Sequence, residues 1–314
     1  MNLQTKISLG KQSNNLIDYE SNILLIGSCF SENIGDKLEY FKFQSVQNPF
    51  GILFHPKAIQ TLIENTVNQK VFSEDDVFFH NEQWHCFDAH SKLSNTSKEE
   101  LIRQLNNSIN VIASQLSKTT HIIITLGTAW VYHFNKANKT VANCHKVSQK
   151  EFTKKLLSVE EVTASLDSIV DLIRKVNSKV SIIFTVSPIR HLNDGFVENT
   201  QSKAHLISAI HQVVKNQSFY FPSYEIMMDE LRDYRFYSED MIHPNQLAIN
   251  YIWNTFKNVW VSDESSKVMD DVDAIQKGLQ HKPFNPQSQS YKAFLQNIEA
   301  KTKTLQSQFP FIKF

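Results

Sequence analysis

The stretch Ile23–Gly35, ILLIGSCFSENIG, contains the signals that decide the fold. Four consecutive apolar residues lead into Gly27, and an all-apolar run of this length is typical of a strand that is buried on both faces, as in a parallel sheet. Ser28 and Cys29 follow, and residues 30–40 then show helical spacing. The stretch predicts a strand-to-helix turn that presents a hydroxyl and a thiol where the strand ends.

Short apolar runs recur along the chain. Two of them, 121–126 (HIIITL) and 180–186 (VSIIFTV), are almost wholly apolar, and a third lies at 218–224. Three- and four-residue spacing of apolar residues predicts helices around these runs, at 30–40, 56–68, 98–116, 159–176 and 244–260. The last of these would hold Pro244 in its first turn, where proline is tolerated. This alternation predicts an α/β fold with a central, mostly parallel sheet.

Two segments depart from the alternation. The aromatic and irregular segment Val77–His90 is interpreted as an inserted loop or hairpin. The segment 263–314 is polar, with sparse apolar positions and a proline-containing break, and it predicts two helices that pack along the body or project from it. We therefore expect an α/β domain over 1–262 and a helical extension over 263–314.

The composition limits the classes of partner. The 314 residues are 41% apolar and 20% charged, which is globular composition, and Lys+Arg and Asp+Glu both number 32. Because no net charge favours nucleic acid or an anionic membrane, a small molecule or a neutral ligand such as a carbohydrate is the expected partner. Oligomeric state does not follow from these numbers.

The cysteines and the N-terminus bear on the compartment. Three scattered cysteines, Cys29, Cys86 and Cys144, do not form a disulfide framework, and an odd count leaves at least one thiol free. No apolar run approaches the roughly 20 residues of a membrane span, and the first residues lack the basic start and apolar run of a signal peptide. The expected location is the cytoplasm.

Cys29 is a candidate nucleophile because of its expected place at a helix start. The free N–H groups and positive dipole end of a helix lower the pKa of a thiol there and stabilise an oxyanion. The alternative is that Cys29 packs as a small buried hydrophobe while Ser28 caps the helix.

The segment Asp240–His243 supplies a candidate base. A carboxylate three residues before a histidine on one loop can accept the Nδ1 proton of the imidazole and leave Nε2 free to act as a base. The alternative is a surface loop with a capping aspartate. Because this loop follows the last expected strand, it belongs to the same sheet edge as Gly27.

Further polar residues are expected near that edge. Arg190 and His191 follow a predicted strand, and together with Lys203 they could hold an anionic part of a substrate; the alternative is a solvated loop in which Ser202 caps a helix. The run 143–145 (Asn-Cys-His) lacks the ligand spacing of a zinc site. We expect neither a metal nor a cofactor, and His145 could line the pocket.

These motifs together carry a resemblance. The strand-end motif at 27–30 and Asp-x-x-His at 240–243 resemble the SGNH, or GDSL-type, hydrolase superfamily, and GSCF itself is similar to the motif that names the GSCFA family within it. Segments that also resemble the family lie at 48–56, 125–132, 141–147, 184–191 and 220–244. The resemblance covers about 23–260. It implies a flavodoxin-like three-layer α/β/α sandwich and acyl-ester chemistry.

Carried over residue by residue, the resemblance leaves the nucleophile open. The superfamily's Gly-Asp-Ser block falls on 27–29, so that the nucleophilic serine falls on Cys29 and the aspartate on Ser28. Either Cys29 replaces the serine, or the backbone shifts by one residue and Ser28 attacks. The ungapped register favours Cys29, because a thiolate beside a histidine is a competent acyl acceptor.

The oxyanion hole implied by the resemblance is incomplete. Its second-block glycine falls on Gly51, and its third block falls on Gly127 and Thr128, with Ala129 where an asparagine amide is expected. Substitute donors within the family-like segments are the side chains of Asn48 and Asn143 and the backbone N–H of Cys29.

Two functions from different classes remain. The first is an esterase or acyltransferase that acts on an acyl ester, with acetyl as the expected group, through Cys29 or Ser28 with His243 and Asp240. Trp84 and Trp130 are compatible with a carbohydrate acceptor. The second is a ligand-binding protein without turnover on the same scaffold, which the altered Gly-Asp-Ser block and the missing asparagine favour. A nucleotide-binding flavodoxin-like protein is disfavoured because no glycine-rich phosphate loop follows the first strand.

Overall fold

The apolar runs form the centre of one parallel sheet in the computed structural model, which describes residues 5–314. Its five strands are β1 (Asn22–Gly27), β2 (Gln44–Gln47), β5 (His121–Leu126), β9 (Ser181–Val186) and β10 (Ser218–Phe221). Every residue of β5 and β9 is buried, as the all-apolar pattern predicted. The short strand β2, which the sequence analysis did not predict, pairs with β1 at the edge of the sheet.

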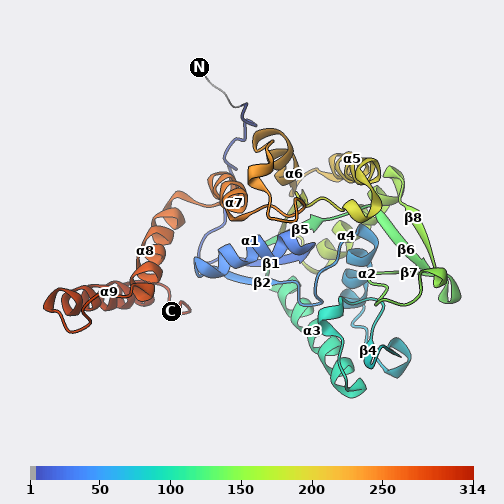
Figure 1. Cartoon of the computed structure of the whole chain (residues 1–314), viewed down its shortest axis with the longest axis horizontal. Helices are drawn as coiled ribbons and strands as arrows, with labels where there is room; N and C mark the ends of the chain where they lie inside the picture. The colour runs from blue at the N-terminus through green and yellow to red at the C-terminus, as the bar shows by residue number, and fades with distance from the viewer. Residues whose placement is uncertain (1–4) are drawn as a thin grey trace.

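Successive strand residues point to opposite faces of the sheet and build two separate cores. Leu24 and Ile26 belong to one core, whereas Ile23 and Leu25 belong to the other. Helices α2 (Pro56–Val67), α3 (Lys98–Lys118), α4 (Val159–Val176) and α5 (Phe196–Val213) supply the first core. Helices α1 (Cys29–Tyr40) and α7 (Gln246–Trp260) supply the second, which gives the three layers of Figure 1.

The strand order is β2-β1-β5-β9-β10, which is the flavodoxin-like doubly wound order. The chain winds outward from β1 in both directions, so the connections after β1 and β5 leave the sheet on opposite faces. A crevice opens at the carboxyl ends of these two strands, where open α/β sheets bind their ligands. Cys29 begins α1 directly after β1, and Gly127 follows β5, so both lie at this crevice.

Two small antiparallel sheets lie beside the central one. The hairpin β3 (Phe78–His80) and β4 (Gln83–His85) forms within the aromatic segment where a loop or hairpin was expected. A second sheet, which was not predicted, consists of β6 (Trp130–Phe134), β7 (Lys139–Val141) and β8 (Phe152–Leu156) in the order β7-β6-β8. It follows β5 directly, so its first residues reach the crevice.

The C-terminal segment forms the two helices that were expected there, α8 (Asp263–Gln280) and α9 (Gln289–Gln308). Met269, Val272 and Ile275 of α8 join the core of the α7 layer, while α9 extends away from the sheet with α8 as its support (Figure 1). Within residues 5–314, no helix combines the length and the apolar composition needed to cross a bilayer.

Several sequence-based assignments differ from the structure. Pro244 precedes α7, which begins at Gln246 behind the cap Asn245, so the expected first-turn proline is wrong. The strand expected over 218–224 ends at Phe221, and the short helix α6 (Ser223–Glu225) follows it. Helix α5 was not predicted, because Asn199, Ser202 and Lys203 interrupt its apolar stripe.

Gly27 permits the close approach of β1 and β5. Its φ is +140°, and a Cβ there would lie 2.1 Å from the carbonyl oxygen of Thr125. We expect Gly27→Ala to lower the free energy of unfolding by about 2–5 kcal/mol, since it combines backbone strain with overpacking. Urea denaturation measures the change. Gly10→Ala is the matched control, because its Cβ would meet nothing within 4 Å, and it should change stability by less than about 0.5 kcal/mol. Equal stabilities would contradict the close approach.

Candidate functional site

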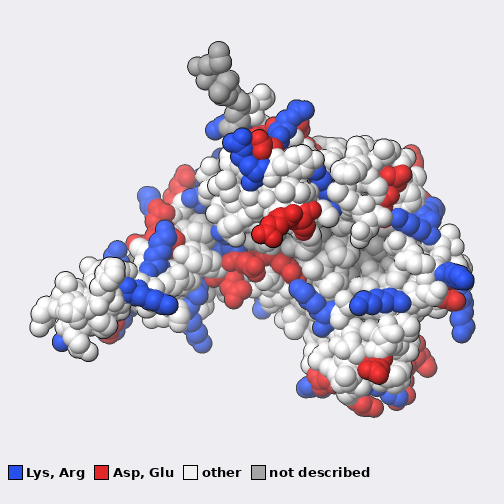
Figure 2. All heavy atoms as spheres, in the orientation of Figure 1, with Lys and Arg blue, Asp and Glu red and all other residues white. Residues whose placement is uncertain are grey.

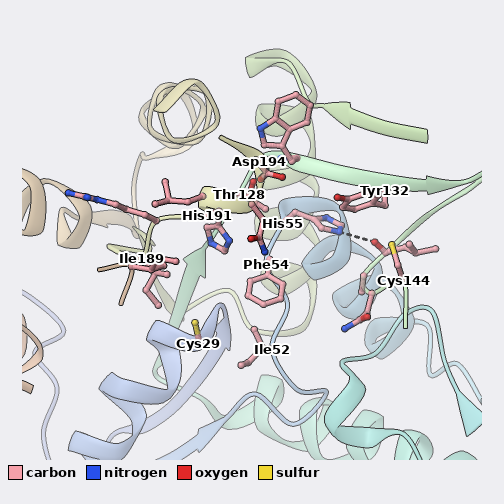
Figure 3. Close-up of a pocket in the computed structure, with 18 of the residues that line it drawn as sticks. Cys29, Ile52, Phe54, His55, Thr128, Tyr132, Cys144, Ile189, His191 and Asp194 are labelled. Carbon is pink, nitrogen blue, oxygen red and sulfur yellow. Dashed lines mark hydrogen bonds between the residues drawn. The ribbon is translucent and has the colours of Figure 1, made fainter. Parts of the chain in front are cut away.

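A cavity of about 550 Å³ opens at the carboxyl end of the sheet. Its walls come from the start of α1, the loop before α2, strands β6 and β7, the segment after β9 and the loop before α7. Figure 3 shows Cys29 on one side of this space and Cys144 on the other, with Phe54, His55 and His191 between them. Over the face in Figure 2, both signs of charge lie interspersed rather than gathered into one patch.

Leaving aside Lys203, Trp84 and Trp130, six of the candidate residues that the sequence analysis proposed line the cavity and six do not. Those that line it are Cys29, Thr128, Asn143, Arg190, His191 and His243. Those that do not are Ser28, Asn48, Gly51, Gly127, His145 and Asp240.

Ser28 and Cys29 have different environments. Ser28 is fully buried, and its Oγ accepts a hydrogen bond from the N–H of Phe30 at 3.3 Å, which makes it the cap of α1. Cys29 is the first helical residue, is partly exposed and lines the cavity. The register that places the superfamily's nucleophile on Cys29 therefore also directs the thiol, not the hydroxyl, toward the open space.

The pKa of Cys29 differs in direction from the sequence-based expectation. Burial is the largest influence and raises the pKa of the thiol above its ordinary value. The N–H groups of Cys29 and Phe30 and the charge of Lys203 act in the opposite direction, as a helix start should, while Glu32 raises the pKa further. The resting thiol is therefore protonated, and a base must remove its proton before it can attack.

Asp240 and His243 form the pair that their spacing predicts. His243 Nδ1 lies 2.6 Å from Asp240 Oδ2, and Asp240 Oδ1 accepts the N–H groups of Ile242 and His243 at 2.9 and 3.0 Å. These bonds lower the pKa of Asp240 to about 2, the backbone contributions being the largest. Because the carboxylate holds Nδ1–H, Nε2 is free to act as a base. The His243 side chain is 49% exposed and lines the cavity that Cys29 also lines.

Helix α5 anchors the two loops that form the back of the cavity. The carboxamide of Asn199 accepts the N–H of His191 at 2.9 Å. Ser202 Oγ accepts the N–H of Ala129 at 2.7 Å and pairs with the Thr128 hydroxyl at 3.0 Å. All three α5 anchors, Asn199, Ser202 and Lys203, are buried. The interpretation of this region as a solvated loop with Ser202 as a cap is therefore wrong.

The backbone donors expected for an oxyanion hole are engaged elsewhere. The N–H of Gly51 donates to Asn48 O at 2.8 Å within a turn. The N–H groups of Gly127 and Thr128 both donate to Phe54 O, at 2.7 and 3.0 Å. These bonds fasten the loop before α2 to the end of β5. The backbone amides of Gly51, Gly127 and Thr128 therefore hold loops in place and do not face a substrate as free donors.

The two asparagines differ in position. Asn48, which has a φ of +40°, accepts the N–H of Gly27 with its Oδ1 at 2.9 Å, and its Nδ2 is buried without a partner. It braces the strand exit from outside the cavity. Asn143 lines the cavity at the wall opposite Cys29, and its Oδ1 accepts the N–H of His145 at 2.8 Å. Of the three substitute donors, the amide of Cys29 is the one beside the thiol.

The two cationic candidates after β9 are not equivalent. Arg190 stacks on Tyr237 at 4.3 Å and faces Tyr234 at 5.5 Å, so its guanidinium joins the β9 end to the His243 loop while it lines the cavity. His191 packs edge-on against the ring of Phe54, and its Nε2 is buried without a partner. Burial, together with the charges of Lys203 and His243, lowers its pKa to about 3. His191 is thus neutral and offers polarity rather than charge.

The far wall of the cavity is aromatic and polar. Trp130 and Tyr132 of β6 line it, and Lys154 of β8 lies over both rings at 4.8 and 5.9 Å while it pairs with Asp194. His55 braces this wall because its Nε2 bonds the carbonyl of Val141 at 3.0 Å (Figure 3). Sequence reasoning selected Trp84 as well, but that ring packs under Lys98 and does not line the cavity.

Cys144 and His145 form no metal site. His145 bonds the carbonyl of Cys86 at 2.7 Å, and burial lowers its pKa to about 4. Burial also raises the pKa of Cys144 to about 11. Among residues 5–314, no three His, Cys, Asp or Glu side chains gather as a group that could hold a metal ion.

Sequence reasoning missed the apolar half of the cavity. Ile52, Phe54, Ile189 and Ile242 line it together with Cys29. All of them lie in loops outside the periodic segments, so no helix or strand pattern marked them. Their shared signal is that all four lie within segments that resemble the family, at 48–56, 184–191 and 220–244.

The fold and the site define an α/β protein with a thiol and an Asp–His pair at the carboxyl edge of a parallel sheet. The chain belongs to the GSCFA family, whose model matches residues 22–256, and the GSCFA domain protein, C-terminal domain, matches residues 272–314. No curated protein matches it. A solved structure, an acetyl xylan esterase (Est2A) from the rumen bacterium Butyrivibrio proteoclasticus, is 11% identical with a TM-score of 0.38 over 78% of this chain and 66% of that chain. The chain thus spans slightly less than two thirds of that protein.

The anchoring role of α5 is testable at Ser202. We expect Ser202→Ala to lower the free energy of unfolding by about 1–3 kcal/mol, because it leaves the buried N–H of Ala129 without a partner. Thr200→Ala is the matched control on the same helix, since that hydroxyl is exposed and bonds only its own helix. Chemical denaturation of both variants measures the difference, and equal midpoints would argue against the anchor.

Proposed function

We propose that this protein is an SGNH-like esterase or acyltransferase that uses Cys29 as its nucleophile, His243 as its base and Asp240 to orient His243. The observation that carries the proposal is that the Cys29 thiol and the Asp240-bound imidazole of His243 line one cavity at the carboxyl edge of the sheet, although they lie more than two hundred residues apart. Ser28 is the less suitable nucleophile because it is buried and caps α1.

The proposed reaction has two halves. His243 Nε2 takes the thiol proton as Cys29 Sγ attacks the ester carbonyl carbon, and the carbonyl oxygen becomes an oxyanion. When the C–O bond breaks, the leaving alcohol receives that proton from His243, and a thioester remains on Cys29. Water or a second hydroxyl then attacks the thioester with His243 again as the base, which restores the thiol.

Stabilisation of the oxyanion is the weakest part of this site. The amide of Cys29 at the start of α1 is the donor that we assign, because those of Gly51, Gly127 and Thr128 already have acceptors. Loss of one donor in such sites costs about 10²–10³ in rate. We therefore expect slow turnover of simple esters.

The cavity walls suggest the substrate class. The apolar residues around Cys29 suit a short acyl chain, for which acetyl is our proposal, and the wall with Trp130, Tyr132 and Asn143 suits a polar alcohol such as a carbohydrate. Arg190 remains a candidate contact for an anionic substituent, because it lines the cavity.

Hydrolysis of p-nitrophenyl acetate tests the assignment. We expect Cys29→Ala to reduce the rate to that without enzyme, and His243→Ala and Asp240→Asn to reduce kcat by about 10²-fold or more, since both disable the base. Ser28→Ala should retain turnover and lose about 1 kcal/mol of stability with the helix cap. His133→Ala, a partly exposed histidine on β6 outside the cavity, is the matched control for His243→Ala.

Mass spectrometry of the Cys29 peptide should detect an acetyl thioester after brief mixing with the substrate. Turnover that survives in Cys29→Ala and disappears in Ser28→Ala would reassign the nucleophile. Wild-type protein that binds an acetylated sugar but forms no thioester and no product would instead establish the ligand-binding alternative.

A further inference from the structure

Lys203 is a fully buried lysine directly behind the candidate site. It is 1% exposed, and its Nζ donates to the carbonyl oxygens of Gly127 at 2.7 Å and Ser187 at 2.8 Å. These carbonyls follow the ends of β5 and β9, so the ammonium lies under the crevice rather than in the cavity. The idea that Lys203 holds an anionic substrate therefore does not fit its position.

Among residues 5–314, no carboxylate pairs with this buried ammonium. Three titratable side chains from different elements interact with the ammonium: Tyr224 on α6, whose ring lies 5.5 Å from Nζ, and, through electrostatic coupling, Cys29 on α1 and His191 after β9. The start of α1 lies against the end of β5 that Lys203 binds, because the N–H of Ser28 donates to the carbonyl of Thr125 at 3.0 Å, two residues before Gly127. His191 is neutral, and burial raises the pKa of Tyr224. An unpaired buried charge costs several kcal/mol, so its retention requires a reason. Cys29 is the one of the three that the proposed reaction makes anionic.

We propose that Lys203 is the built-in counter-charge of the Cys29 thiolate, an electrostatic positioning residue that favours the deprotonated nucleophile from behind the active site. Its catalytic consequence rests on the proposed function. When the thiol proton passes from Sγ to His243 Nε2, a negative charge appears on sulfur and a positive charge on the imidazole, while Lys203 keeps its own proton. The ammonium offsets the new charge without leaving its two carbonyls.

The electrostatic coupling between Lys203 and Cys29 predicts a specific dependence of thiolate formation on pH. Burial lowers the pKa of Lys203 to about 7, and the charge of Cys29 raises it in return. Lys203 therefore favours the thiolate below about pH 7, where it is protonated, and loses this effect as the pH rises and the amine becomes neutral. Two charged side chains act on the thiol: Glu32 of α1 raises its pKa, and Lys203 lowers it. We expect removal of the Lys203 charge to raise the pKa of Cys29 by about one unit, which is about a tenfold change in thiolate fraction.

Alkylation of Cys29 by iodoacetamide measures the fraction of Cys29 that is thiolate, and it needs no acyl substrate. Peptide mass spectrometry separates Cys29 from Cys86 and Cys144, and rates are compared over about pH 5.5–9 in full-length protein. We expect Lys203→Met to slow alkylation by about tenfold at the acidic end and the ratio to approach one at the alkaline end. Lys203→Gln, which keeps donors but no charge, should behave like Lys203→Met. Lys118→Met, an exposed lysine at the end of α3, should match wild type.

One arm of the experiment does not depend on the folding of any Lys203 variant. In His243→Ala, where the proposed base is gone, the logarithm of the alkylation rate should rise with a slope below one between about pH 7 and 8, as Lys203 loses its proton. A slope of one throughout, or a Lys203→Met ratio that does not vary with pH, would overturn the proposal. In the esterase assay, Lys203→Met should lower kcat at pH 6 with little change in KM. If the alkylation rates show the coupling between Lys203 and Cys29 but the protein hydrolyses no ester, the proposed function is contradicted and the role of Lys203 is not.

Discussion

Buried backbone at the carboxyl edge of the sheet must find hydrogen-bond partners, and the rest of the site depends on how this is done. The loops after β5 and β9 turn away from the sheet inside the protein, where their N–H and C=O groups lack water. Helix α5 supplies partners from three polar side chains on one face, Asn199, Ser202 and Lys203. The carbonyl of Phe54 accepts two further amides, those of Gly127 and Thr128.

This arrangement gives the glycine-containing motif at 127–128 a structural role in addition to its proximity to the candidate site. The amides of Gly127 and Thr128 fasten the segment before α2 to the end of β5 and so set the width of the crevice. Gly127 also leaves room for the imidazole of His191, whose Nε2 would lie 3.1 Å from a Cβ at this position. The site is therefore held by backbone bonds, while few backbone donors remain for a substrate.

The proposed nucleophile and the proposed base differ in their exposure to solvent. Cys29 is partly buried, and its pKa is raised because burial outweighs the helix start. His243 and Asp240 lie on a half-exposed loop, where backbone bonds hold the carboxylate ionised. Because the thiol is protonated, the proposed attack requires proton transfer to the oriented base across the cavity that both residues line. In our proposal the buried ammonium of Lys203 offsets the resulting charge. In the proposed mechanism, the thiolate therefore forms only when Cys29 attacks a substrate.

Much of the fold followed from the sequence, because periodicity reports burial. The all-apolar runs at β1, β5 and β9, the helix over 159–176 and the Asp240–His243 pair depend on local pattern and spacing, and the sequence by itself determined them. Helix α5 was missed because polar residues occupy part of its buried face. Residues 199, 202 and 203 lie on the same face as Leu206 and Ile210, but this is visible only when the segment is known to be a helix. The tertiary structure alone decided three things. It decided that the thiol of Cys29 rather than the hydroxyl of Ser28 faces open space, which backbone amides have no acceptor, and which groups surround Lys203. The physical reason is that burial and hydrogen-bond partners depend on segments distant in sequence.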